Sequence, residues 1–287
     1  MKLALGTANF GQIYGLSKKN INLKKKIKNI LETSNKLNIN LVDTSVNYGS
    51  AEKLLGKNDL KKFKVVSKLN LSKNTFKRKT NIEKLIFKTV EKSLINLNIN
   101  KLHGILLHNV DDLKNNKRLL IIQTLRKLKK LKLVSKIGVS IYEPKDLDYI
   151  WTFWKPDIIQ CPFNILDQRI YKSGWMSKLK KNKIEIYARS VFLQGLLLKN
   201  TNDIPKKFHK WKKFITKFIN YCKKSKISQL EACINFTKSF KDLSYVVIGF
   251  ENLNQIKQSV KIFNNSNNNK IVSFECNEKK LIDPRLW

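Results

Sequence analysis

The sequence lacks several features that would place the protein in a membrane or outside the cell. No window approaches the roughly 18 uninterrupted apolar residues that a membrane-spanning helix needs. The start, MKLALGTANFG, has one lysine and neither a sustained apolar segment nor a small-residue cleavage site, so no signal peptide is predicted. Cys161, Cys222, Cys233 and Cys276 have neither CxxC nor zinc-ligand spacing. We therefore expect a soluble cytoplasmic protein with reduced thiols and no metal site.

Arginine and acidic residues are also scarce. The chain has 58 Lys and Arg against 21 Asp and Glu, for a net charge of +37, and such a charge ordinarily suggests nucleic acid or an anionic membrane. However, only six of these residues are arginine, the residue type that binds phosphate and guanine edges through two parallel hydrogen bonds. The charge alone is therefore a weak indication of a nucleic-acid partner. The arginines are at positions 78, 118, 126, 169, 189 and 285.

The lysines are spread along the whole chain and accompanied by many Asn and Ile, and all three residue types have A/T-rich codons. Compositional drift of the genome explains this distribution as well as a ligand does. We expect weak non-specific adhesion to nucleic acid at low salt. We predict no specific nucleic-acid partner and no membrane partner.

The pattern of the chain is that of alternating strands and helices. Its 287 residues, 42% of them hydrophobic, can form one large domain or two ordinary ones. Apolar residues at i, i+3 and i+4 spacing predict helices over 27–37 and 82–97, with lysines on the solvated faces. Strands are predicted at 3–8, 40–43, 64–68, 103–107, 134–139, 157–161, 184–188 and 244–248.

Eight strand–helix units predict an α/β fold, a (β/α)8 TIM barrel that forms a single domain over residues 1–287. The main alternative is a doubly wound sheet. A dinucleotide-binding sheet of that kind needs G-x-G-x-x-G where the first helix begins, and the glycines of GTANFGQIYG are spaced differently. There is no linker and no fixed-period repeat that would divide the chain.

Unusual polar residues follow three successive predicted strands. Asp43 ends the second strand and Tyr48 follows it within VDTSVNYGSAEKLLG, Lys68 ends the third, and His108 closes the fourth. Each alone has an ordinary explanation as a turn, cap or solvent-exposed residue. Because barrel enzymes place their active sites at the carboxyl ends of the strands, we expect these four side chains to meet.

The chemistry that these four side chains share is proton transfer. A tyrosine hydroxyl has an ordinary pKa of about 10, and a nearby cation lowers it by stabilising the phenolate. We expect Lys68 to be that cation, Asp43 to fix the lysine, and a neutral His108 to orient a substrate oxygen. This arrangement would protonate a carbonyl oxygen while a hydride attacks its carbon.

At this point the sequence resembles the aldo/keto reductase superfamily over nearly its whole length. The resemblance implies that Asp43, Tyr48, Lys68 and His108 match the catalytic tetrad of the family, with Tyr48 as general acid. It also implies that NADPH or NADH binds extended across the barrel mouth without a Rossmann fold. The segments that carry it, in the order of the family, are LGTANFG, VDTSVNYGSAEKLLG, VVSKL, VEKSLINLNINKLHGILLHN, SKIGVS, IIQCPFN, YARSVFLQGLLL and VVIGFENLNQI.

The resemblance also implies residues that bind the cofactor. Ser140 and Gln160 match residues that hold the carboxamide. Arg189 and Ser190 fall where the family has an aromatic residue or arginine near the nicotinamide, followed by residues that contact the pyrophosphate. The last strand leads into a helix N-terminus whose backbone N–H groups suit a phosphate. In this last segment the predicted cofactor-binding residues are Gly249, Glu251, Asn252 and Gln255.

Two positions depart from the pattern of the family. Members that prefer NADPH usually have Lys or Arg just after the last strand, where this chain has Glu251, which has the wrong sign for the 2′-phosphate. The large positive charge of the chain favours the more anionic NADPH, so the preference stays open. Ile141 stands where the family often has Asn, and one hydrogen bond to the carboxamide is therefore expected to be absent.

The predicted function is reduction of an aldehyde, a ketone or a sugar carbonyl, and the expected partner is that small molecule. The segments RSVFLQG and IDPRLW look like those of members associated with carbohydrate metabolism. Two alternatives stay open, an aldose dehydrogenase that works in the oxidative direction and a cofactor-binding regulatory module with slow turnover. The intact set of four residues argues against the second alternative. The sequence does not predict the oligomeric state.

Overall fold

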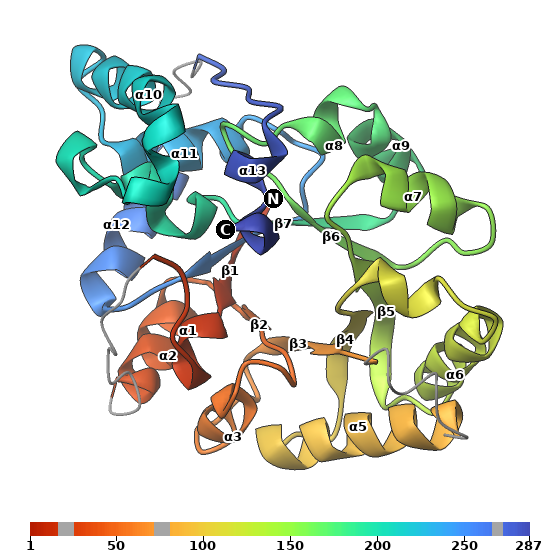
Figure 1. Ribbon diagram of the computed structural model, residues 1–287. Coiled ribbons are helices and arrows are strands. Elements are labelled where there is room, and N and C mark those ends of the chain that lie inside the picture. Colours follow the sequence, from red (N-terminus) through yellow and green to blue (C-terminus); the bar gives the residue numbers. More distant parts are fainter. Residues whose placement is uncertain (17–25, 72–80, 266–271) are drawn as a thin grey trace.

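The computed structural model describes residues 1–16, 26–71, 81–265 and 272–287. Eight parallel strands form a closed barrel in which each strand neighbours the next one along the chain, and helices surround it (Figure 1). The strands are β1 (Lys2–Gly6), β2 (Leu41–Asp43), β3 (Lys64–Leu69), β4 (Leu102–Leu107), β5 (Val134–Ser140), β6 (Ile158–Pro162), β7 (Glu185–Arg189) and β8 (Tyr245–Gly249).

The predicted (β/α)8 barrel is confirmed. All eight predicted strands occur, and their ends shift by one or two residues. The largest shift is at β1, which ends at Gly6 instead of residue 8 because Thr7 already precedes the short helix α1 (Ala8–Gly11). The doubly wound alternative is wrong, since β1 pairs with both β2 and β8 and thereby closes the sheet.

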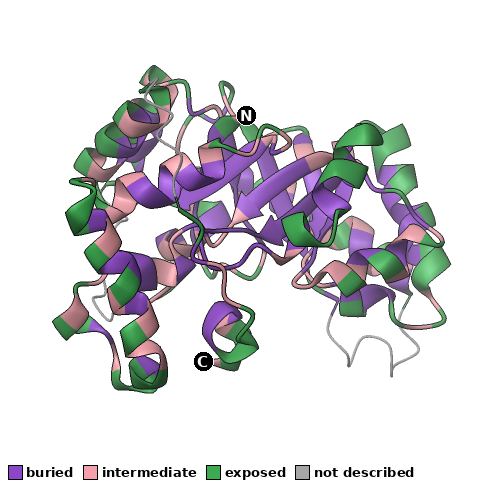
Figure 2. Ribbon diagram, turned by 90° about the horizontal axis from the view of Figure 1, so that it is seen from above, coloured by how far each residue is buried: buried purple, intermediate pink, exposed green. Residues whose placement is uncertain are grey.

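Amphipathic helices cover the outside of the barrel. The helical periods predicted over 27–37 and 82–97 form α2 (Ile27–Lys36) and α5 (Ile82–Leu97). Figure 2 shows the result, with buried residues on the strands and on the inner faces of the helices. The other long helices are α6 (Arg118–Lys130), α7 (Pro144–Trp151), α10 (Lys212–Lys224), α11 (Gln229–Lys238) and α12 (Leu253–Asn264).

Shorter elements lie around the barrel and at its mouth. Among the helices of the described ranges, none combines the length and the apolar character that crossing a bilayer demands. These shorter elements are α3 (Ala51–Leu55), η2 (Val110–Leu113), α8 (Arg169–Lys172), α9 (Trp175–Lys181), η3 (Leu193–Leu198), η4 (Thr201–Asp203), η5 (Lys206–Trp211), α13 (Lys279–Ile282) and η6 (Pro284–Leu286).

The inside of the barrel is filled by side chains. Tyr187 is fully buried there, and its hydroxyl donates to Glu185 Oε2 at 2.9 Å. A second buried cluster lines this interior, separate from the core under the helices, and consists of Ala4, Leu41, Val66, Leu106, Ile158, Tyr187, Tyr245 and Val247. A filled barrel leaves its mouth as the place for a ligand.

The last residues of the chain lie at the mouth of the barrel. Figure 2 shows the two termini at opposite ends of the barrel, and because residue 1 precedes β1, the C-terminus lies where the strands end. Lys279 of α13 forms an ion pair at 2.9 Å with Glu143, which follows β5. The C-terminal segment therefore contributes to the surroundings of any site at the mouth.

Candidate active site

The residues predicted at the strand ends lie at this mouth. Asp43 is the last residue of β2, Lys68 the second to last of β3, and His108 directly follows β4. Tyr48 lies in the turn between β2 and α3. A methyl group on Gly49, which has φ of +58°, would lie 2.3 Å from the carbonyl oxygen of Gly11. Glycine is therefore required beside Tyr48, and this close approach fixes the turn against α1.

Lys68 is the centre of the group. Its ammonium donates to Asp43 Oδ2 at 2.7 Å, to the carbonyl oxygen of Thr44 at 2.9 Å and to the hydroxyl of Tyr48 at 3.5 Å. The other carboxylate oxygen of Asp43 accepts from Gln160 Nε2 at 2.8 Å. Burial lowers the pKa of Lys68, and the charge of Asp43 opposes that effect. The result is a buried ion pair whose two charges compensate each other.

The expected lowering of the pKa of Tyr48 is wrong. Burial and the nearby carboxylate of Asp43 raise the pKa of Tyr48, and the charge of Arg189 offsets only part of that rise. We expected Lys68 to lower it. The main physical reason is that the phenol is buried, and Asp43, which lies closer to the ammonium than the phenol does, already compensates the charge of Lys68. Tyr48 is consequently a neutral phenol that holds its proton at pH 7.

His108 is neutral, as the sequence predicted. Burial and the positive charges of Lys68 and Arg189 lower its pKa to about 3. Its Nδ1 lies 3.1 Å from the hydroxyl of Ser45, and its ring meets the ring of Tyr48 edge-on at 5.9 Å between centroids. The contact with Ser45 occupies one ring nitrogen and leaves Nε2 for another partner.

A cavity of about 610 Å³ lies beside these residues. It is bordered by Asp43 and Tyr48, by Arg189 and Ser190 at the end of β7, and by residues at and after the end of β8. Lys68 and His108 are not among the residues that border it, but both contact Tyr48, which does. Of the residues predicted to bind the cofactor, those that line the cavity are Arg189, Ser190, Gly249, Glu251 and Gln255.

Three other residues predicted to bind the cofactor do not line the cavity, namely Ser140, Gln160 and Asn252. Ser140 and Gln160 are paired across β5 and β6, are almost fully buried and do not line the cavity. The amide N–H of Gln160 is already used by Asp43. Asn252 does not line the cavity either, and its side chain caps α12 by accepting from the backbone N–H of Gln255 at 3.0 Å.

The cavity suits an extended dinucleotide. It reaches from Tyr48 to Glu251, next to the N-terminus of α12, where backbone N–H groups favour a phosphate. Asn9 Oδ1, on the same wall, is buried and has no hydrogen-bond partner within the described ranges, although Nδ2 of that side chain donates to the carbonyl oxygen of Phe250. Gly249 leaves the wall open to a flat ligand. The free acceptor Asn9 Oδ1 suits a hydrogen bond from a ribose hydroxyl or from an amide N–H of the ligand.

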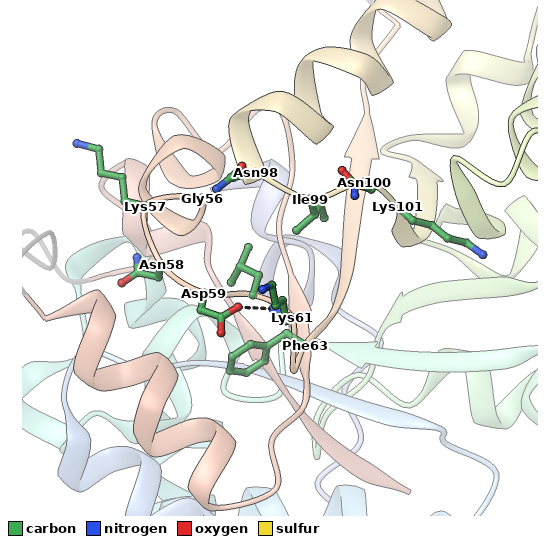
Figure 3. Close-up of a pocket in the computed structure, with 11 residues that line it drawn as sticks. Gly56, Lys57, Asn58, Asp59, Lys61, Phe63, Asn98, Ile99, Asn100 and Lys101 are labelled. Carbon is green, nitrogen blue, oxygen red and sulfur yellow. Dashed lines mark hydrogen bonds between the residues drawn. The ribbon is translucent and has the colours of Figure 1, made fainter.

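A second cavity, of about 510 Å³, lies at the other end of the strands. It is lined by residues 56–61 and Phe63, before β3, and by residues 98–101, before β4. Figure 3 shows that Lys57 and Lys101 point away from each other, so their charges do not converge on one ligand. In the described part of the chain, no cluster of His, Cys, Asp and Glu has the composition of a metal site. The cavity at the mouth is the better candidate.

Several residues near Tyr48 were not predicted. Tyr14 lines the same cavity and is 43% exposed. Tyr142, after β5, contacts the guanidinium groups of both Arg189 and Arg285. The scarcity of arginine in a lysine-rich chain is a signal that could have identified this region, because Arg189 and Arg285 both contact Tyr142 at the barrel mouth.

Comparisons with known proteins agree with this geometry. The model of the Aldo/keto reductase family matches residues 2–273. The aldo-keto reductase AKR11C1 from Bacillus halodurans, in its holo form, has a TM-score of 0.74 at 17% identity over 92% of this chain and 87% of that one. The glycerol dehydrogenase AKR11B4 from Gluconobacter oxydans has a TM-score of 0.69 at 21% identity over 91% and 86%. At these identities the two structures support the fold. Comparison with curated sequences gives no match.

Proposed function

The chain belongs to the aldo/keto reductase family of NAD(P)(H)-dependent oxidoreductases, and we propose that it reduces an aldehyde, ketone or sugar carbonyl with Tyr48 as the general acid. One observation carries the assignment of Tyr48. The ammonium of Lys68 bridges the buried carboxylate of Asp43, at 2.7 Å, and the hydroxyl of Tyr48, at 3.5 Å, and Tyr48 borders the cavity. A phenol supported by a buried cation is suited to give up and regain a proton.

The proton moves from the Tyr48 hydroxyl to the carbonyl oxygen of the substrate. The raised pKa of Tyr48 keeps the proton in place until negative charge develops on that oxygen, which is then the stronger base. The phenolate that forms is stabilised by Lys68, whose charge lies in a site of low polarity where electrostatic interactions are strong. Asp43 holds Lys68 in position through their ion pair.

His108 orients the substrate oxygen. Its imidazole is neutral, because burial and the charge of Lys68 lower its pKa to about 3. If the hydroxyl of Ser45 donates to Nδ1, then Nε2 carries the ring proton and donates to the carbonyl oxygen. A bound nicotinamide supplies the hydride for the carbonyl carbon. The hydrogen bond from Nε2 polarises the carbonyl and directs its oxygen toward Tyr48.

The cofactor is NADPH or NADH, and residues along the cavity hold it. Ser190, Gly249, Glu251 and Gln255 border the cavity between β7 and α12, and Asn9 offers a buried acceptor without a partner. Glu251 suits a ribose hydroxyl better than a 2′-phosphate, whereas the net charge of +37 favours the more anionic cofactor. Both cofactors therefore belong in the assay.

The expected partner is a small-molecule carbonyl or sugar, and the expected location is the cytoplasm. All four cysteines are free, and Cys161, Cys222 and Cys233 are buried. One similar structure is a glycerol dehydrogenase, which agrees with the carbohydrate-related segments RSVFLQG and IDPRLW. The spread of lysine over the whole sequence supports our expectation that no specific nucleic acid is bound.

The test is oxidation of NADPH and NADH with a panel of aldehydes, ketones and sugars, followed by absorbance. The Tyr48→Phe variant removes the proton donor and is expected to lower kcat by at least about 100-fold, because general acid catalysis contributes about 10²–10⁴-fold. The cofactor Kd of this variant, measured by fluorescence titration, is expected to stay close to that of the wild type.

Tyr171→Phe is the matched control, since it also removes a phenol hydroxyl but from α8, where the side chain is 45% exposed. This control should retain wild-type turnover. Undiminished kcat in Tyr48→Phe would disprove the assigned mechanism. Cofactor binding without turnover of any carbonyl in the wild type would instead favour a regulatory module.

A further inference from the structure

The hydroxyl of Ser45 lies where the ends of three strands meet. Ser45 is 1% exposed and stands between β2 and the turn that carries Tyr48. Its Oγ lies 3.1 Å from Nδ1 of His108, which follows β4, and 3.5 Å from the carbonyl oxygen of Lys68 in β3. It also accepts the backbone N–H of Asn47 at 3.2 Å. A buried hydroxyl is costly unless it is hydrogen-bonded, so the direction of each of these contacts matters.

The contact with Asn47 has an ordinary structural explanation. A serine side chain that accepts the N–H two residues later forms a local turn, which helps to shape the segment before Tyr48. That turn uses only a lone pair of Oγ. A serine hydroxyl has one proton to donate and two lone pairs that accept. The proton therefore has two acceptors within reach, Nδ1 of His108 and the carbonyl oxygen of Lys68.

The choice between these acceptors determines which nitrogen of His108 carries a proton. The imidazole is neutral, because burial and the charges of Lys68 and Arg189 lower its pKa to about 3, so only one of its nitrogens is protonated. A hydroxyl that donates to Nδ1 requires the proton on Nε2. A hydroxyl that donates to the carbonyl oxygen instead accepts from a protonated Nδ1, and Nε2 is then a lone pair that repels the oxygen of a substrate.

The distances favour donation to His108. An N···O separation of 3.1 Å lies within the ordinary range of about 2.7–3.2 Å, whereas 3.5 Å exceeds the roughly 3.0 Å limit of O–H···O bonds. The carbonyl oxygen of Lys68 also accepts the backbone N–H of Val46 at 3.3 Å, so it has a partner without the hydroxyl. Among the residues that the structure describes, Nδ1 of His108 has no partner other than Ser45. The hydroxyl therefore satisfies a nitrogen that would otherwise be left unpaired.

His108 is held from other sides as well. Its backbone N–H donates to the carbonyl oxygen of Leu69 at 2.7 Å, and its ring meets the ring of Tyr48 edge-on. The side chain is only partly buried, and in the described ranges its Nε2 has no hydrogen-bond partner. With the ring fixed in this way, Nε2 is the atom of the imidazole that is left for a substrate.

We propose that Ser45 is a positioning residue whose hydroxyl donates to Nδ1 of His108 and thereby keeps the imidazole in the tautomer that carries its proton on Nε2. In this form His108 donates to the carbonyl oxygen that Tyr48 protonates. Ser45 is not among the residues that border the cavity, and it acts on the substrate through the imidazole. The inference rests on the proposed reductase function and deepens it by naming the residue that selects between the two forms of His108.

The first test is the ¹⁵N NMR spectrum of the whole chain labelled with [¹⁵N]histidine. The chain has only 3 histidines, and the resonances that disappear in His108→Ala identify the ring. Protonated and unprotonated ring nitrogens resonate far apart, so the spectrum reports the tautomer directly. In the wild type, Nε2 is expected to be protonated and Nδ1 unprotonated. Ser45→Ala should populate both tautomers, and Ser45→Thr, which keeps the hydroxyl, should restore the single form.

Turnover supplies the second test. Ser45→Ala is expected to lower kcat by about 3- to 10-fold, the usual effect of losing one neutral hydrogen bond, and to leave the cofactor Kd close to that of the wild type. If Ser45 acts through His108, the same substitution should have no further effect on kcat in the His108→Ala background.

Ser93→Ala is the matched control. It also removes a fully buried serine hydroxyl, but from α5, and this hydroxyl has no hydrogen-bond partner in the described part of the chain. The control should keep both the tautomer of His108 and the kcat of the wild type.

A protonated Nδ1 in the wild type would overturn the inference, and turnover that still depends on Tyr48 would leave the proposed function intact. An unchanged tautomer in Ser45→Ala, or a full further loss of kcat in the His108→Ala background, would also overturn it, because the hydroxyl would then only shape the turn before Tyr48. Absence of turnover with every carbonyl, combined with a tautomer that depends on Ser45, would refute the reductase and retain the assignment of the hydroxyl.

Discussion

The ammonium of Lys68 lies 2.7 Å from Asp43 Oδ2, and the two side chains are only 1% and 5% exposed. Moving two charges out of water costs several kcal/mol for each ion, and this cost is offset only when the pair is close and its other donors and acceptors are satisfied. Both conditions hold, since Thr44 and Gln160 complete the hydrogen bonds. We therefore propose that this pair at a strand end serves function more than stability.

Asp43→Asn is predicted to damage both the fold and the activity. The substitution leaves Lys68 buried without an anionic partner, and its ammonium, whose pKa burial already lowers, is expected to lose its proton near neutral pH. The free energy of unfolding should fall by about 3–5 kcal/mol, as measured by urea denaturation. Reduction of carbonyls should also fall, since a neutral lysine does not stabilise the phenolate of Tyr48.

The double variant Asp43→Asn, Lys68→Met separates the two effects. Without a buried charge in either position, stability should return most of the way to that of the wild type, because a neutral pair has no desolvation cost. Activity should stay low. An Asp43→Asn variant as stable as the wild type would show that the ion pair in solution is not the buried one described.

Activity is predicted to be insensitive to ionisation of His108. Burial and Lys68 lower the pKa of this imidazole to about 3, so it is neutral at every pH above about 5. The profile of kcat against pH should therefore have no inflection near 6.5, the ordinary pKa of histidine. Initial rates from pH 5 to 9, corrected for cofactor loss, test this. An acidic limb near 6.5 that disappears in His108→Gln would contradict it.

The fold was predictable because its signals are local and repeated. Eight apolar runs alternate with helical periods, and each unit such as residues 82–107 carries enough information for a helix followed by a strand. The boundaries were less certain, since whether a residue such as Thr7 extends a strand depends on a contact with a distant one. In this case Thr7 donates to the carbonyl oxygen of Asp43.

The candidate site was predictable to the extent that strand ends determine it. Asp43, Lys68 and His108 follow from the strand pattern, because parallel strands end at one rim. The electrostatics did not follow, since the raised pKa of Tyr48 comes first from the burial of its hydroxyl and then from the charge of Asp43, and both depend on the tertiary structure. The contact of Arg285 with Tyr142 was also not predictable, because it requires the C-terminal segment to lie at the barrel mouth.

Asp112 is predicted to make stability fall as pH rises. It is 4% exposed, and burial raises its pKa from 3.8 to about 7, although it accepts the backbone N–H of Leu71. Between these values the folded protein keeps a proton that the unfolded chain releases, so the free energy of unfolding decreases with pH. The slope is about 1.4 kcal/mol per pH unit, and it vanishes below about 4 and above about 7.

Asp112→Asn retains an acceptor oxygen for Leu71 and removes the ionisation. Relative to the wild type, this variant should gain about 4 kcal/mol of stability by pH 8 and little at pH 4, as measured by urea unfolding at several pH values. Asp203→Asn, at an exposed position in η4, is the control and should show no such gain. Identical pH dependence of Asp112→Asn and the wild type would rule out Asp112 as the source.

Two glycines in the barrel should respond oppositely to substitution by alanine. A methyl group on Gly249 would lie 3.6 Å from the carbonyl oxygen of Gly6 and 3.7 Å from Asn9 Oδ1, which are ordinary contacts, but it would enter the cavity. Gly249→Ala should leave the free energy of unfolding within about 0.5 kcal/mol and raise the cofactor KM several-fold.

On Gly138 the methyl group would lie 2.2 Å from the carbonyl oxygen of Ile158, so the backbone must move. Gly138→Ala should cost more than about 3 kcal/mol. A stable Gly138→Ala, or a Gly249→Ala with unchanged cofactor binding, would show that the barrel or its cavity is arranged differently.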